Sequence, residues 1–209
     1  MRERLGLLSE IDAYVGKYYS VEWVRKSVLQ QSEGNPLYLT LLCQGLEQGV
    51  YELNAKNVPK NMVEMYQNVM IRLQEKSPLA IQMLLLLAAA KDFVSINMLA
   101  ELLEVDTARI VNDVLTNALE LLYENPVTEE IEDYQLFHES LREFLVAQYG
   151  SEVQQWAHKL SQWGYNWRGT DGDLILSGDS LMYAMKHTVT HLMECRAAAL
   201  SNAKLVKAN

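Results

Sequence analysis

The sequence has few cysteines, few prolines and few basic residues, and each shortage restricts the structures or partners that the chain is expected to have. The two cysteines, Cys43 and Cys195, have no metal-type spacing, which favours a reduced, cytoplasmic setting over a disulfide framework. The four prolines are rare enough that each is expected to mark a helix boundary. Lysine and arginine number 18 against 27 aspartates and glutamates, a net charge of −9. This balance argues against a nucleic-acid partner, because phosphate binding needs a concentrated basic face.

Long apolar segments are also missing. The chain opens MRERL, without the apolar region of a signal peptide, and its most apolar run, residues 84–90, is far too short to span a bilayer. That run is instead predicted to be a buried helix, and no membrane partner is expected. With 49% hydrophobic and 22% charged residues, the composition is that of an ordinary globular protein of one or two small domains.

Apolar residues at helical spacing predict four helices between residues 9 and 75. Ser9 and Ser20 can cap the first two helices, and Pro36 suits the first position of the third. Gly34 suits the left-handed position that ends the second helix. Short connections between these helices predict a small four-helix bundle.

From residue 77 the pattern changes to three helices followed by two strands. Ser77, Ser95 and Thr107 can cap the helices, and short strands near 120–125 and 133–138 flank an acidic loop. This is the order of a winged-helix domain. Further helices are predicted after Ser151 and from Ser180 onward. The predicted fold is therefore mainly α, with a four-helix bundle (1–76), a winged-helix domain with a small β-wing (77–149), and trailing helices that form a linker or begin a repeat array (150–209).

The period of the chain switches from strand to helix around His138. Tyr134, Leu136 and His138 alternate with Gln135 and Phe137, as in a half-buried strand, whereas Leu141 and Phe144 follow helical spacing. A histidine near a helix N-terminus lies where free backbone N–H groups favour an anion such as phosphate. The alternative is a histidine that caps the helix or packs in the core.

Two segments carry a resemblance to a known family. SEGNPLYL (32–39) resembles the GxP motif in the helical lid of STAND nucleotide-triphosphatases, the signalling branch of the AAA+ class that includes NACHT and NB-ARC proteins. LFHESLREFLVA (136–147) resembles a stretch at the end of their winged-helix domain, and the separation of about 100 residues between the two is similar.

The resemblance implies a nucleotide switch. It implies that Pro36, with Gly34 and Asn35 beside it, packs near the base of the nucleotide, and that His138 reaches the β-phosphate of ADP. ADP would hold the inactive state, and exchange for ATP would release the winged helix and permit homo-oligomerisation. The implied partners are an upstream P-loop domain and a downstream repeat or sensor domain.

The chain departs from that family in one major respect. It contains no Gly-x-x-x-x-Gly-Lys-Ser/Thr loop and no apolar strand ending in paired aspartates for Mg²⁺. By itself it is therefore predicted not to be an enzyme. It would form the regulatory portion of a signalling ATPase and bind ADP or ATP only with the upstream domain, and it would hold no metal.

Two other functions stay open from the residues alone. One is a helical interaction scaffold without a ligand. The other is a DNA-binding winged-helix regulator, for which the reading helix (106–122) carries Arg109 against three acidic residues. His187, His191 and Cys195 recur every four residues, a spacing that zinc could use, although a packed helix face is the preferred interpretation. Trp156, Trp163 and Trp167 are likewise interpreted as packing residues rather than as a stacking surface.

Overall fold

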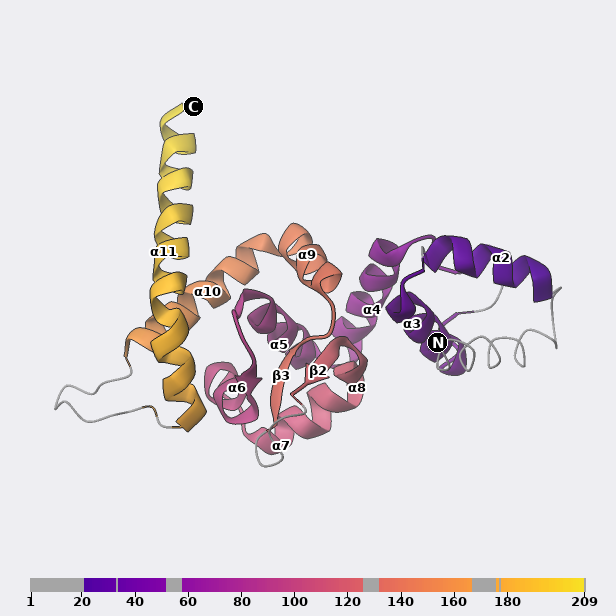
Figure 1. Cartoon of the computed structure of the whole chain (residues 1–209), viewed down its shortest axis with the longest axis horizontal. Helices are drawn as coiled ribbons and strands as arrows, with labels where there is room; N and C mark the ends of the chain where they lie inside the picture. Colours follow the sequence, from indigo (N-terminus) through magenta and orange to yellow (C-terminus); the bar gives the residue numbers. More distant parts are fainter. Residues whose placement is uncertain are drawn as a thin grey trace. The chain divides into compact units, whose positions relative to one another are not determined.

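The computed structural model describes residues 21–32, 34–51, 58–125, 132–166, 176 and 178–208 (Figure 1). The chain divides into two compact units, Met1–Arg72 and Leu73–Asn209. The described residues are mainly helical and include a small three-stranded antiparallel sheet. The predicted fold class is confirmed. None of the described helices is both long and apolar enough to cross a membrane.

The described part of the first unit contains α2 (Val21–Ser32), α3 (Pro36–Glu47) and most of α4 (Met62–Lys76). The predicted turn between α2 and α3 is confirmed, because Gly34 has a φ of +78° and Pro36 lies in the first turn of α3. The Asn35 side chain caps α3 by accepting a 2.9 Å hydrogen bond from the Leu37 N–H. The helix predicted to begin at Ser9 lies outside the described residues.

The core of the first unit is built around α3. Tyr38 is fully buried, and its hydroxyl donates to the carbonyl of Pro59. Apolar side chains of α3 and α4 make up most of this core; they are Leu37, Leu39, Leu41, Leu42, Leu46, Met65, Tyr66, Val69 and Met70. Burial on nearly all sides of α3 follows from its almost uniformly apolar sequence.

The second unit begins with the element order of a winged helix. Its first helix, α5 (Pro78–Ala89), is almost entirely buried, and Ser77 caps it as predicted. The elements that follow are β1 (Val94–Ser95), α6 (Ile96–Leu103), α7 (Thr107–Arg109), a π-helical turn (Ile110–Leu115), α8 (Thr116–Ala118), a 3₁₀ turn (Leu119–Leu121), β2 (Leu122–Glu124) and β3 (Asp133–Leu136). The sheet order is β1-β3-β2, with Val94 opposite Tyr134 and Tyr123 opposite Gln135.

Two details of the third helix differ from the sequence prediction. Thr107 does not cap it; the carboxylate of Asp106 does, accepting a 2.6 Å hydrogen bond from the Arg109 N–H. A charged oxygen interacts more favourably with a helix N-terminus than a neutral hydroxyl does. The helix is also interrupted by the π-helical turn, since hydrophobic spacing fixes which face is buried but not the local hydrogen-bond pattern.

Three helices complete the second unit, namely α9 (Glu139–Gln148), α10 (Gly150–Tyr165) and α11 (Gly178–Ala208). α10 packs against α5 and α11, and the C-terminal part of α11 projects beyond α10 (Figure 1). The prediction that Ser180 caps α11 is wrong. The helix begins two residues earlier at Gly178, whose φ of +54° lets the chain turn into the helix there.

Candidate functional site

His138 is the N-cap of α9. Its Nδ1 accepts a 3.1 Å hydrogen bond from the Ser140 N–H and lies 2.8 Å from the Ser140 hydroxyl. The side chain is exposed, whereas those of Tyr134 and Leu136, with which it was predicted to share one face of a strand, are buried. Because β3 ends at Leu136, the strand pattern does not extend to residue 138. The capping interpretation of this histidine accounts for its contacts.

The other residues assigned by resemblance lie in the first unit. Gly34 and Asn35 end one helix and start the next, and Pro36 is exposed in the first turn of α3. This combination satisfies the local backbone at a helix-to-helix turn without any ligand. No contact of the described residues bears on a nucleotide role for these three residues or for His138.

The segment 136–147 instead joins α9 to α5, chiefly through Arg142. Its Nη1 donates to the carbonyls of Leu87, Ala88 and Ala90, at 3.2, 2.5 and 2.9 Å. Carbonyls at the C-terminal end of a helix have no partner within the helix, and a cation there also complements the helix dipole. Sequence reasoning missed this role, because nothing local to Arg142 indicates which distant helix it caps.

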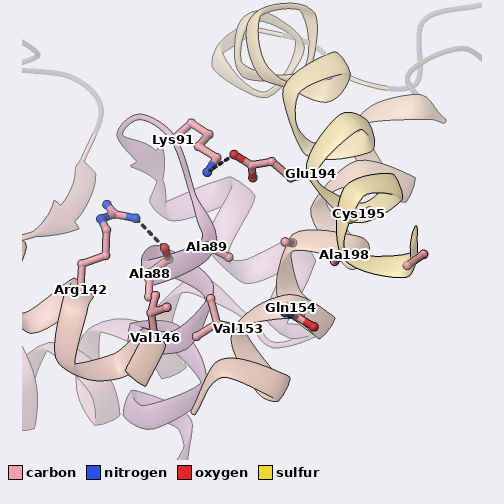
Figure 2. A pocket seen from close by; sticks show the side chains of 12 residues that line it. Ala88, Ala89, Lys91, Arg142, Val146, Val153, Gln154, Glu194, Cys195 and Ala198 are labelled. Atoms are coloured by element: carbon pink, nitrogen blue, oxygen red, sulfur yellow. Dashed lines mark hydrogen bonds and ion pairs between the residues drawn. The ribbon is translucent and has the colours of Figure 1, made fainter. Parts of the chain in front are cut away.

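A cavity of about 480 Å³ lies between the end of α5 and helices α9, α10 and α11 (Figure 2). Its lining is mostly small and apolar, with Ala88, Ala89, Val146 and Val153 among the residues that line it. At one side Lys91 forms a 2.8 Å ion pair with Glu194 of α11. The charged groups that line the cavity, Lys91, Glu194 and Arg142, thus each have a partner within the protein.

The histidines predicted to offer zinc-type spacing have other partners. His191 is fully buried, and its Nε2 lies 3.1 Å from the Tyr183 hydroxyl, which also accepts a 3.1 Å hydrogen bond from the Lys91 N–H. Burial lowers the pKa of His191 to about 4, so this ring is neutral at pH 7. His187 lies 3.4 Å from the Asp92 carboxylate. Among the described residues no group of three or more histidines, cysteines and carboxylates is placed to hold a metal ion.

The tryptophans also divide between packing and the surface. The Trp163 ring contacts Tyr183 edge-on, with centroids 6.5 Å apart. Lys159 lies over the Trp156 ring at 5.3 Å. Trp167 lies outside the described residues. Trp163 thus contributes to the α10–α11 contact, as the packing interpretation predicts.

The helix that would read DNA in a winged-helix regulator offers little positive charge. From Thr107 to Leu121 its one basic residue is the exposed Arg109, whereas Asp113 and Glu120 are acidic. Val111 and Leu119 are exposed apolar residues of the same segment. Phosphate contacts dominate the affinity of DNA-binding proteins, so this surface is unsuited to a duplex.

Two apolar surfaces of the second unit are exposed to solvent. The outer stripe of α11 consists of Met182, Met185, Val189 and Met193, which are between 54% and 67% exposed. The aromatic cluster consists of Phe93, Tyr123 and Phe137 on the sheet, and the last two are 40% and 50% exposed. Sequence reasoning assigned neither surface, although the spacing of 3, 4 and 4 residues in the outer stripe was visible in it.

Comparison with known proteins overturns the STAND resemblance. A family model described as bacteriophage T4-like portal protein (Gp20) matches residues 1–42, a range that includes the SEGNPLYL segment. No curated protein matches the chain. The portal match covers 42 of the 209 residues and therefore does not establish the family of the whole chain. The STAND assignment was wrong: Gly-Asn-Pro suits any turn where one helix ends and another begins, so the motif alone does not identify a family.

Proposed function

We propose that this chain is a helical protein-interaction module that pairs with a second copy of itself through the outer stripe of α11. The observation that carries the proposal is that α11 is apolar on two opposite faces. Tyr183, Ala184 and His191 are buried on the side that packs in the unit, while the outer stripe is exposed. A helix that is apolar on both sides is typically covered on both sides.

The spacing of the outer stripe suits another helix. Met182, Met185, Val189 and Met193 recur at intervals of three and four residues, so they form one ridge along α11. A ridge of this kind packs into the groove of a second helix. Exposed methionines also adapt readily to the surface of a partner.

Charges at the two ends of the outer stripe favour a second copy in antiparallel orientation. Asp179 precedes the stripe and Arg196 follows it, and both are exposed. An antiparallel pair centred on Val189 places Met185 opposite Met193 of the second copy and Arg196 about one helical turn from its Asp179. A parallel pair would instead bring like charges together at each end.

The test is the mass of the full chain in solution across a wide range of concentrations, measured by sedimentation. We expect a concentration-dependent dimer that the double substitution Met185→Glu and Val189→Glu abolishes. Ile71→Glu, at a similarly exposed apolar position of α4, is the matched control and should leave dimerisation unchanged. A wild-type chain that stays monomeric throughout the range would exclude the self-association.

A charge-exchange experiment tests the antiparallel register. Asp179→Arg and Arg196→Asp should each weaken the dimer, and the two together should restore it. If both single variants dimerise like the wild type, the proposed orientation is wrong. If only a foreign helical protein binds the stripe, the second copy is excluded as its occupant.

A further inference from the structure

The aromatic cluster lies on the solvent-facing side of the sheet. Phe93 precedes β1, whose Val94 pairs with Tyr134, and Tyr123 of β2 pairs with Gln135 of the central strand. The Phe93 and Tyr123 rings meet across that central strand with centroids 6.0 Å apart, and Phe137 lies 6.5 Å from Tyr123. Side chains alternate along a strand, so the buried Val94, Leu122 and Leu136 cover the opposite, core side.

Three aromatic residues in this place are unusual for a sheet face in contact with water. The solvated face of an antiparallel sheet is ordinarily polar, but here Gln135 of the central strand lies among aromatic rings. An exposed apolar cluster with a defined shape marks a binding surface more often than a structural one.

The charge beside the aromatic cluster is negative. Asp133 lies two positions before Gln135 on the same face of β3, and one of its carboxylate oxygens is buried without a hydrogen-bond partner among the described residues. Burial raises the pKa of Asp133, and the nearby carboxylates of Asp179 and Asp92 raise it further, while a hydrogen bond from Asn125 lowers it. Glu124 and Glu132 are also exposed, but Glu124 is in register with the buried Tyr134 and Glu132 accepts a hydrogen bond from the Tyr134 hydroxyl, so both lie toward the other face of the sheet.

The Lys186 ammonium of α11 is already engaged near this region, because it lies 3.6 Å from the Asp92 carboxylate. The His187 ring lies 3.4 Å from the same carboxylate. Lys186 offsets the charge of Asp92, and the negative charge of Asp133 remains beside the rings. The surface therefore combines exposed aromatic faces with the carboxylate of Asp133, which is the arrangement that attracts a cationic side chain.

We infer that the aromatic cluster and Asp133 bind a basic segment of another protein, with an arginine side chain resting against the rings. Arginine suits the site better than lysine, because its planar guanidinium stacks on an aromatic ring while its N–H groups donate to a carboxylate oxygen. A nucleic acid could stack on the same rings, but the Asp133 carboxylate would repel its phosphates. The inference does not depend on pairing through α11, because the cluster lies on the sheet.

The experiment measures the affinity of the full chain for a nine-residue arginine peptide by calorimetry. Tyr123→Ala combined with Phe137→Ala leaves the net charge unchanged, so it isolates the contribution of the rings. We expect this variant to bind at least about fivefold more weakly, since each cation–ring contact contributes roughly 0.5–1 kcal/mol at an exposed site. The control variant combines Val111→Ala, in the π-helical turn, with Leu119→Ala, in the 3₁₀ turn. Both positions are exposed, and this variant should bind the peptide like the wild type.

Two further measurements define the site. Tyr123→Phe retains the ring and should retain binding, whereas Asp133→Asn should weaken it. A lysine peptide of the same length should bind more weakly than the arginine peptide. Equal affinity of the wild type and the double alanine variant would show that only the overall negative charge attracts the peptide and would overturn the inference. Tighter binding of a thymidine oligonucleotide than of the arginine peptide would overturn it as well.

Discussion

The hydroxyl of Tyr183 lies 3.1 Å from Nε2 of His191, and both side chains are buried within the second unit. The Lys91 N–H donates to the same hydroxyl, and the hydroxyl proton can in turn be donated to Nε2 of a neutral His191 ring. His191 Nδ1 is buried without a partner among the described residues. This histidine therefore belongs to the interior of the protein, and protonation would place an uncompensated charge there.

The first prediction concerns pH. The pKa of His191 is lowered from 6.5 to about 4 in the folded chain, chiefly by burial, so the unfolded chain binds a proton first as the pH falls. The contribution to stability is complete above about pH 6.5 and declines toward pH 4, by on the order of 2–3 kcal/mol. Urea unfolding at several pH values measures it.

His191→Gln is the control for this prediction. Its stability should lack the decline between pH 6.5 and 4 that His191 causes in the wild type. Asp133 has a raised pKa in the folded chain, so its protonation increases stability as the pH falls. This contribution is the same in both proteins and cancels in the comparison. An identical pH profile for the two proteins would show that His191 does not titrate as described.

The second prediction concerns Arg142. Arg142→Lys keeps the charge but replaces the guanidinium that reaches three carbonyls at the end of α5. Because buried carbonyls would lose their partners, we expect the free energy of unfolding to fall by about 1–3 kcal/mol. Arg109→Lys, at an exposed site, should change it by less than about 0.5 kcal/mol. Thermal melts that give both variants the same midpoint would contradict this.

The third prediction compares two glycines of α10. A methyl group on Gly164 would collide with the side chain of Thr188 on α11, whereas one on Gly150 would meet nothing within 4 Å. Gly164→Ala should therefore destabilise the chain by about 1–3 kcal/mol through overpacking. Gly150→Ala should be neutral or stabilising by up to about 1 kcal/mol, because alanine favours the helix. Urea midpoints in the reverse order would show that α10 and α11 do not cross at Gly164.

The fourth prediction separates the cap from the core of α9. His138 is exposed and caps the helix through the Ser140 N–H, while Phe144 is buried. His138→Ala should cost about 0.5–2 kcal/mol, as the loss of a helix cap does. Phe144→Ala should cost about 3–5 kcal/mol because it leaves a cavity. If thermal melts show equal losses, His138 has a packing role that its exposure does not indicate.

The sequence by itself determined most of the local structure. Ser77 and Ser95 cap α5 and α6 as predicted, and Gly34 adopts the predicted left-handed conformation. Each of these features depends on hydrogen bonds or backbone preferences within about four residues, so the neighbouring residues in the sequence are enough to predict it. One such prediction was wrong: Thr107 was expected to cap the third helix of the second unit, but the adjacent Asp106 caps it.

Only the tertiary structure decided which surfaces and contacts could serve a function. Arg142 reaches carbonyls more than fifty positions away, Tyr183 reaches the Lys91 N–H across 92 positions, and Phe93 meets Tyr123 across the central strand. The two segments that suggested a nucleotide site form a helix-to-helix turn at Gly34–Pro36 and a helix cap at His138. The spacing of apolar residues along the chain indicates which side of a helix or strand is apolar. It does not indicate which other element covers that side, because packing brings together residues that are far apart in the sequence.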